Sequence, residues 1–281
     1  MSAWTELAQA KLPCGDLLTL RRRDCDFEIR LNLYELMSSR NPASERHLAR
    51  LAGAAIDAAE PCILIGGLGL GYTARAVLDE VGPGARIVVA ELIEEVIAWN
   101  RGAVGEAAGR PLDDPRLEVV AGDVADVLLA RPAGFDAILM DVDNGPEAVM
   151  FPGNRNLYTP AGLALMLSSL RPGGVLALWA AEPSAGFEAI LAASGLAQRV
   201  PVHVHAAAGA VEHVIYLLRA EAGGDSPALR QGRSTLTSVG PRGRRGAGDD
   251  REGEPAGSGA AAAMALRLRP FGTRADPDDE A

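Results

Sequence analysis

The middle of the chain alternates between two hydrophobic periods, which predicts strands and helices in regular succession. Apolar runs of strand length lie at 62–66, 86–91, 117–121, 135–141 and 174–180. Helical patterns lie at about 71–81, 93–104, 160–170 and 184–194, and a further helix is expected to begin near residue 123. Short links between strands and helices are typical of a parallel sheet with helices on both faces.

The last two predicted strands, 199–205 and 211–219, are joined by a short Ala-Gly link. A link of that length is too short for a crossover and predicts an antiparallel hairpin. Seven strands that end in a hairpin are the arrangement of class I S-adenosylmethionine-dependent transferases, whereas a dinucleotide dehydrogenase more often continues its parallel winding. We therefore expect an α/β fold with a Rossmann-like seven-stranded sheet.

The two ends of the chain differ from this central domain. Residues 1–60 contain two β-patterned runs, 17–22 and 27–33, which predict a hairpin that turns at 24–26 and precedes a helix at about 43–59. Residues 221–281 are rich in Gly, Arg, Pro, Ser and Asp, and we expect them to be disordered because they cannot bury enough apolar surface. The expected domains are thus 1–60, 61–220 as the cofactor-binding domain, and the tail 221–281. The N-terminal hairpin is a candidate edge for a homodimer.

The amino-acid composition limits the classes of partner that this protein is expected to bind. The formal net charge of −10 argues against nucleic acid, because phosphate binding needs a basic face. No apolar run approaches the roughly 20 residues of a membrane span, so we expect no membrane association and a cytoplasmic location. Three separated cysteines suggest neither a disulfide framework nor a zinc site. His203 and His205 alternate on a predicted strand, but two ligands without a third are weak evidence, so no metal is expected.

The first candidate site is a glycine loop between the strand at 62–66 and the helix that follows it. Gly66, Gly67, Gly69 and Gly71 fall within six positions, where a backbone without Cβ can turn sharply and let a ligand approach. One strand later, Glu91 stands at the carboxyl end of the run 86–91. A glycine loop paired with such an acid indicates a nucleoside pocket in which the carboxylate accepts hydrogen bonds from the ribose hydroxyls.

Further candidates follow the next two strands. Asp123 follows the strand at 117–121, where it can accept a hydrogen bond from an adenine amino group, cap a helix, or do both. Asp141, Asp143 and Asn144 follow the apolar strand at 135–141. A carboxylate there can deprotonate an amine nucleophile or neutralise a sulfonium, although Asp and Asn are also ordinary turn residues. We expect Asp141 to be catalytic, with Asp143 and Asn144 as weaker catalytic candidates.

From about residue 15 to residue 218 the chain resembles the spermidine synthase family, the polyamine aminopropyltransferases. The matching stretches are Leu64-Ile65-Gly66-Gly67, Glu91-Leu92, Asp114-Pro115-Arg116-Leu117, Gly122-Asp123, Phe135-Asp136-Ala137-Ile138-Leu139-Met140-Asp141 and Leu170-Arg171-Pro172-Gly173-Gly174-Val175. The resemblance implies a small N-terminal β-domain joined to a class I methyltransferase-like domain. It also implies that Glu91 holds the ribose, Asp123 the adenine side, and Asp141 the attacking amine.

The chain departs from the family pattern in the part that would bind the substrate. Gly69 stands where the family carries an Asp that contacts the aminopropyl end of decarboxylated S-adenosylmethionine, and Asn144 replaces the family's second acid. Its Tyr-His-Glu appears as Ala43-Ser44-Glu45, and the Tyr of a late Phe-Tyr pair aligns with Leu163. The nucleoside half of the site is kept, and the half that would handle a diamine is rebuilt.

These observations leave several functions open. The first is a spermidine synthase-like transferase of polyamine biosynthesis, which uses an S-adenosyl cofactor and passes an aminopropyl group to a polyamine or similar amine. A methyltransferase that uses S-adenosylmethionine and an unknown nucleophilic acceptor has nearly equal support, because the loop lacks its acid. A non-catalytic nucleoside-binding module is a further alternative. A nicotinamide dehydrogenase rests only on the G-x-G-x-x-A pattern of residues 69–74.

Overall fold

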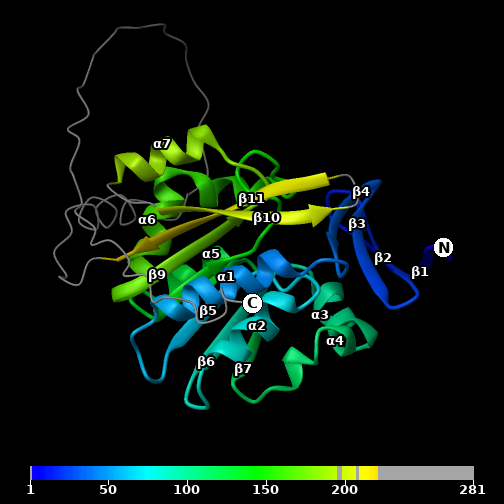
Figure 1. The fold of residues 1–281 in the computed structure, drawn as a ribbon, viewed down its shortest axis with the longest axis horizontal. Coiled ribbons are helices and arrows are strands. Elements are labelled where there is room, and N and C mark those ends of the chain that lie inside the picture. The colour runs from blue at the N-terminus through cyan, green and yellow to red at the C-terminus, as the bar shows by residue number, and fades with distance from the viewer. Residues whose placement is uncertain (1, 195–197, 207–208, 221–281) are drawn as a thin grey trace, which may run out of the picture.

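The computed structural model describes residues 2–194, 198–206 and 209–220, which form two β-sheets and the helices around them (Figure 1). The predicted disordered tail, 221–281, lies outside the described residues. Among the helices of the described ranges, none combines the length and the apolar character needed to cross a membrane.

In the described chain the larger sheet has seven strands with the order β10-β11-β9-β8-β5-β6-β7. The strands are β5 (Cys62–Gly66), β6 (Arg86–Glu91), β7 (Leu117–Ala121), β8 (Phe135–Met140), β9 (Leu170–Ala180), β10 (Gln198–Ala206) and β11 (Gly209–Arg219). Strands β5 to β9 run parallel, while β11 pairs antiparallel with both β9 and β10. The expected Rossmann-like sheet with a terminal hairpin is confirmed.

Strand order reverses at β5, which lies between β6 and β8. The chain first winds outward through β6 and β7 and then crosses back to place β8 on the other side of β5. Ligands of open α/β sheets bind outside the carboxyl ends of the strands at such a switch point. The topology therefore brings the glycine loop after β5 beside the acidic turn after β8.

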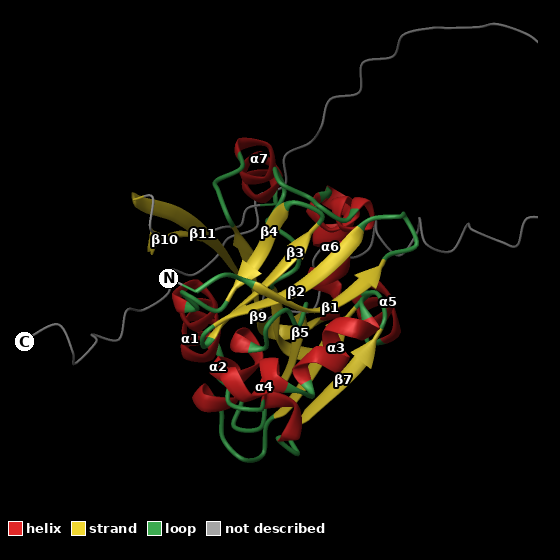
Figure 2. Ribbon diagram, turned by 90° about the vertical axis from the view of Figure 1, so that its right-hand side faces the viewer, coloured by secondary structure: helices red, strands yellow, loops and turns green. Residues whose placement is uncertain are grey.

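Helices cover both faces of this sheet (Figures 1 and 2). They are α1 (Ala43–Ala55), α2 (Tyr72–Glu80), α3 (Glu94–Asn100), α4 (Ala103–Ala107), α5 (Val124–Ala130), α6 (Pro160–Ser169) and α7 (Ala185–Ala193). Alternate strand residues enter two cores: Ile63 and Ile65 pack with helices α1 to α4, whereas Leu64 packs with α5 to α7. Burial on both faces explains why each central strand reads as a continuous apolar run.

Local sequence fixes where several helices begin. Asp123, Thr159 and Ser184 are the N-caps of α5, α6 and α7, and each side chain accepts a hydrogen bond from a backbone N–H of the first turn. Pro160 follows Thr159 at the first helical position, where its missing N–H costs nothing.

The N-terminal region forms a four-stranded antiparallel sheet, which Figure 2 shows crossing in front of the larger sheet. Its strands are β1 (Thr5–Lys11), β2 (Leu17–Arg23), β3 (Asp26–Leu31) and β4 (Tyr34–Ser38). The predicted hairpin is β2 and β3, and Asp24 in its turn adopts a positive φ of 56°. Sequence analysis missed β1 and β4, because most residues of β1 are exposed, no residue of β4 is fully buried, and neither strand carries a clear alternation of apolar residues.

Three other expectations need correction. The helix predicted at 93–104 is two helices, α3 and α4, which turn at Gly102; a Cβ on Gly105 would lie 1.9 Å from the carbonyl oxygen of Asn100. The predicted turn at Gly173-Gly174 lies inside β9, where the pairing with β8 shifts register. Two 3-10 helices, Pro111–Asp113 and Pro152–Tyr158, were not anticipated.

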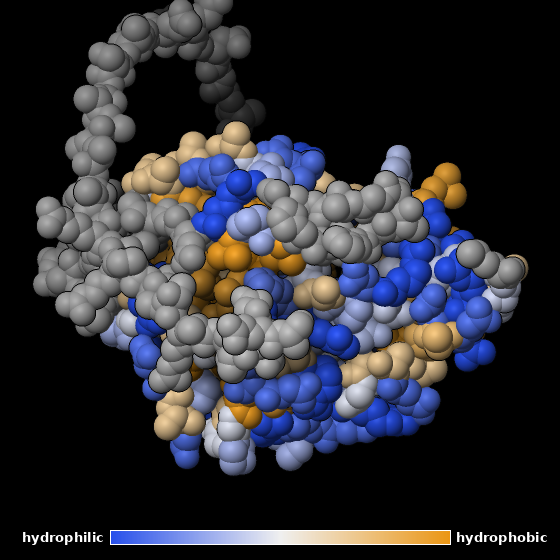
Figure 3. Space-filling view, viewed as in Figure 1, coloured by the Kyte–Doolittle hydropathy of each residue, from blue (hydrophilic) through white to orange (hydrophobic). Residues whose placement is uncertain are grey.

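The face of the molecule in Figure 3 is mostly hydrophilic over the N-terminal sheet and the neighbouring helices, while hydrophobic residues gather near the β10–β11 side. The hydrophilic area agrees with a chain of net charge −10.

A substitution at Gly67 tests how closely the loop after β5 approaches the turn after β8. Its φ is +89°, and a Cβ there would lie 2.3 Å from the backbone oxygen of Asp141. Gly173→Ala is the matched control, since Gly173 has a φ of +80° but nothing within 4 Å of its would-be Cβ. We expect Gly173→Ala to lower the free energy of unfolding by roughly 1–2 kcal/mol and Gly67→Ala by about 3 kcal/mol or more. Equal losses in urea denaturation would contradict the close approach.

Candidate active site

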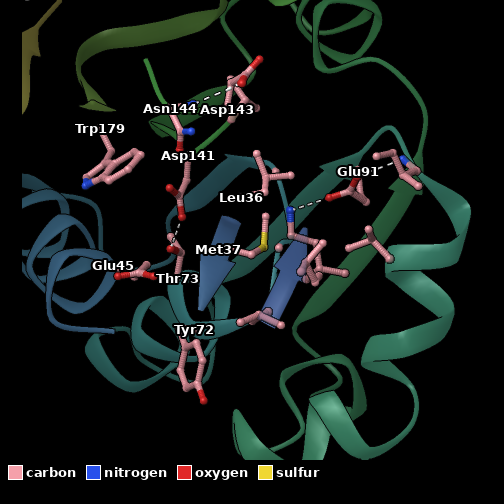
Figure 4. Close-up of a pocket in the computed structure, with 18 of the residues that line it drawn as sticks. Leu36, Met37, Glu45, Tyr72, Thr73, Glu91, Asp141, Asp143, Asn144 and Trp179 are labelled. Atoms are coloured by element: carbon pink, nitrogen blue, oxygen red, sulfur yellow. Dashed lines mark hydrogen bonds between the residues drawn. The ribbon is translucent and has the colours of Figure 1, made fainter. Parts of the chain in front are cut away.

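A cavity of about 640 Å³ lies at the carboxyl ends of the central strands. The glycine loop, the ends of β6 and β8, the start of α1, and β4 of the N-terminal sheet line it. Figure 4 shows side chains from these distant segments converging on one space. The predicted residues Gly67, Gly69, Glu91, Asp123, Asp141, Asp143 and Asn144 all line this cavity, whereas Gly66 and Gly71 are not in its wall.

The glycine loop is a tight turn between β5 and α2. Gly67, Gly69 and Gly71 all have positive φ, and Gly71 is the left-handed N-cap of α2. The Gly67 N–H donates to the Ala90 carbonyl at 2.9 Å, which ties the loop to β6. Asn100 on α3, which sequence analysis missed, donates from Nδ2 to the Gly69 carbonyl at 2.8 Å.

Glu91 is buried at the end of β6 and holds the loop through its carboxylate. Its Oε2 accepts from the Leu68 N–H at 2.9 Å, and its Oε1 accepts from the Ile93 N–H at 2.9 Å. Burial raises the pKa of Glu91, and these backbone donors oppose the rise. The backbone N–H groups of Gly69 and Leu92 act on the carboxylate as well, and Glu91 lines the cavity where a ligand would meet it.

Asp123 lies at the exposed rim of the cavity, where its Oδ1 accepts from the Ala125 N–H at 2.9 Å. The helix-capping interpretation of Asp123 is therefore confirmed. Among the described residues Asp123 Oδ2 accepts no hydrogen bond, and recognition of an adenine by this carboxylate stays a prediction.

Asp141 has a different environment, deep in the cavity and beside α2. Its N–H donates to the Gly66 carbonyl at 2.9 Å, and its carboxylate accepts a short hydrogen bond from the Thr73 hydroxyl (Figure 4). Burial, and secondly the negative charge of Glu45, raise the pKa of Asp141 to about 7, while the Thr73 bond lowers it. Such a carboxyl can exchange a proton near neutral pH.

Asp143 holds the loop that follows β8. Its Oδ1 accepts from the Met150 N–H at 2.6 Å, and its Oδ2 accepts from the Phe151 N–H at 2.9 Å and from Asn154 Nδ2 at 3.1 Å. These donors show that Asp143 holds the loop in place. Sequence analysis could not distinguish this structural role from a catalytic one. Asn144 instead keeps its side chain toward the cavity, next to Asp141 (Figure 4).

The cavity also contains residues that sequence analysis did not assign to it. Met37 on β4 fills the space beside Gly69, since a Cβ at that glycine would lie 2.9 Å from Met37 Sδ. Trp179 on β9 and His213 on β11 pack edge to face, with ring centroids 5.0 Å apart. His213 is half-buried, and burial lowers its pKa. Of these three residues, only Trp179 could have been assigned to the cavity from the sequence, because it lies at the end of a predicted strand.

Comparison with known proteins gives the same resemblance as the sequence motifs. No protein-family model matches the chain. Polyamine aminopropyltransferase 2 of Pseudomonas aeruginosa is 34% identical over 146 residues, which are 48% of this chain and 37% of that protein. A spermidine synthase in complex with the transition state analogue AdoDATO superposes with a TM-score of 0.61 at 17% identity, over 78% of this chain and 73% of the other. The chain is similar to the spermidine synthases.

The spermidine synthase from Thermotoga maritima gives the same picture, with a TM-score of 0.62 at 16% identity over 78% of this chain and 74% of the other. At these identities the structural matches establish the fold. The chain spans little more than a third of the length of the curated Pseudomonas relative. The spermidine synthase-like resemblance is thus confirmed, and the activity is argued separately below.

The raised pKa of Asp141 predicts how stability depends on pH. With its pKa raised to about 7, Asp141 holds a proton in the folded state up to about that pH, whereas the unfolded state loses it near the ordinary aspartate pKa of 3.8. Stability should therefore fall as the pH rises between these values. Asp141→Asn should melt close to wild type at pH 5 and above it at pH 8, by about 2–4 °C for each kcal/mol recovered.

Thermal melts of both proteins from pH 5 to 8 measure this difference. Burial also raises the pKa of Glu45. The melting temperature of Asp141→Asn should therefore still fall as the pH rises, but less steeply than that of the wild type. Identical profiles for the two proteins would show that Asp141 titrates normally.

Proposed function

We propose that the chain is a transferase that uses an S-adenosyl cofactor and passes an aminopropyl group to a small amine, as its similarity to the spermidine synthases implies. The observation that carries this proposal is Asp141, a carboxyl with a pKa of about 7 at the switch point of the sheet, next to the glycine loop. An amine acceptor needs such a group, because only its deprotonated form can attack carbon.

The walls of the cavity fit a nucleoside. Its volume of about 640 Å³ is in the range of small-molecule sites. Glu91 lines the wall where it would accept hydrogen bonds from ribose hydroxyls, and the loop residues 67–70 line the same wall. When bound, the cofactor would supply a carbon made electrophilic by its sulfonium.

The protein's own contribution is then orientation and proton transfer. Asp141 would accept the proton of the acceptor ammonium, and Thr73 would hold the carboxylate in place through its hydroxyl. Asn144 would present an amide to the same region. Holding the nucleophile in line with the reacting carbon accounts for most of the rate gain in such a substitution.

Methyl transfer is the second candidate, and Met37 favours it. The thioether of Met37 lies beside Gly69, so position 69 presents no carboxylate to the free amine of a decarboxylated cofactor. Turnover with S-adenosylmethionine and with its decarboxylated form separates the two activities. Transfer from S-adenosylmethionine alone would replace aminopropyl transfer by methyl transfer as the conclusion.

Asp141→Asn is the decisive variant for either reaction. We expect it to lower kcat by about 100-fold or more, the usual contribution of a general base, while methylthioadenosine binding measured by calorimetry stays near wild type. Asp126→Asn, on the exposed face of α5 and outside the cavity wall, is the control. Unchanged turnover in Asp141→Asn would remove the central assignment.

Glu91→Gln probes the nucleoside half of the site separately. Its amide keeps one acceptor oxygen but cannot accept from both Leu68 and Ile93 as the carboxylate does. We expect methylthioadenosine to bind roughly tenfold more weakly or worse, since a bond to a charged group is worth more than 1.4 kcal/mol. Wild-type affinity in this variant would place the ribose elsewhere.

A further inference from the structure

The acids of the cavity differ in what neutralises them. Six carboxylates line the wall, at Glu35, Glu45, Glu91, Asp123, Asp141 and Asp143. Four of them are held by donors that compensate the charge: Arg40 pairs with Glu35 at 2.7 Å, and backbone N–H groups bind Glu91, Asp123 and Asp143. The two that remain, Glu45 and Asp141, need a separate explanation.

Glu45 and Asp141 have hydroxyl partners and no bonded cation. Thr73 donates to Asp141, and Ser44 donates to Glu45 Oε2 at 2.7 Å. Within the described ranges, no arginine or lysine forms an ion pair with either carboxylate. Partly buried acids that have no ion-pair partner are costly unless they hold a proton or receive a cation.

The two carboxylates face the same part of the cavity. Figure 4 shows Glu45, at the start of α1, and Asp141, at the end of β8, on either side of Thr73. Each contributes to the electrostatic environment of the site: the charge of Glu45 raises the pKa of Asp141, and burial raises the pKa of Glu45 itself. Trp179 stands next to Asp141 and offers an aromatic surface, which also favours a cation.

We propose that Glu45 and Asp141 together form the binding site for the ammonium group of the acceptor, with Glu45 as its positioning residue. This inference rests on the proposed function, because it places the amine acceptor in the same cavity. It adds that Glu45 supplies the second carboxylate, which Asn144 does not provide. Without an amine, the raised pKa of Asp141, about 7, keeps a proton on that carboxyl below neutral pH. Arrival of R–NH3+ expels that proton to solvent and leaves two carboxylates around one cation.

Other charged and titratable groups act on the pair from the surrounding elements. Arg46 on α1 lowers the pKa of Glu45, and the charges of Asp141 and Asp143 raise the pKa of Tyr158. Glu45 also acts on Tyr72, and Arg40, which pairs with Glu35, and His213 on β11 line the same cavity wall. Burial lowers the pKa of His213, so it is neutral and supplies no counter-charge at neutral pH.

Glu45→Gln tests the proposal, because glutamine keeps an oxygen for the Ser44 hydroxyl while removing the charge. Glu60→Gln, an exposed residue outside the cavity, is the matched control. The probes are 1,4-diaminobutane and butylamine, titrated calorimetrically into the full chain with methylthioadenosine present. Repeating the titration at pH 6.5 and 8.5 in buffers of different ionisation enthalpy counts the protons released.

We expect the wild type and Glu60→Gln to bind amine and to release more protons at pH 6.5 than at pH 8.5. Glu45→Gln should bind roughly tenfold more weakly or worse and release fewer protons at pH 6.5, because one charge-assisted bond is lost. Its melting profile should also lose part of its dependence on pH. A role confined to starting α1 would move neither the proton count nor the pH dependence.

Wild-type amine affinity and proton release in Glu45→Gln would overturn the proposal, and so would a wild type that binds neither amine. Failure of the proposed function looks different. If amines bind and release protons as expected but no S-adenosyl donor gives transfer, the ammonium site stands and the transferase does not.

Discussion

The site depends on one close approach of backbone at the switch point of the sheet. The loop after β5 passes so near the carbonyl of Asp141 that only a glycine fits at position 67. Hydrogen bonds from Gly67 to Ala90 and from Asp141 to Gly66 then join the ends of three neighbouring strands. This contact fixes the carboxylate of Asp141 against α2, where a hydroxyl and no cation meets it. A buried acid with a raised pKa follows from that placement.

The N-terminal sheet completes the cavity that this contact begins. Its strand β4 lays Met37 against Gly69, and the helix that follows it brings Glu45 opposite Asp141. Where the resembled family carries an acid, the loop here has a glycine whose free space a thioether fills. The loop therefore carries no carboxylate at this position. Among the described cavity acids, Asp141 after β8 and Glu45 on α1 are the two that no ion pair and no backbone amide of another residue holds.

Sequence alone predicted the central domain well because its strands are buried on both faces. Continuous apolar runs such as Cys62–Gly66 leave few alternatives to a parallel strand, and short links set the order of strands and helices. The outer strands β1 and β4 were missed because most residues of β1 are exposed and no residue of β4 is fully buried. The break between α3 and α4 depends on the packing of Gly105 against Asn100, two residues whose contact no helical period reveals.

The sequence by itself determined the fold class, the glycine loop and the set of acids at the strand ends, since these follow from local periods and from strand order. Only the tertiary structure decided what each acid does. Asp141 and Asp143 stand two positions apart in one turn, yet loop amides surround Asp143 while Asp141 faces the cavity. Glu45 comes from a distant helix, and nothing in its local pattern distinguishes it from a surface residue. The ionisation of a carboxylate depends on which donors and charges lie around it in space, and packing alone brings those together.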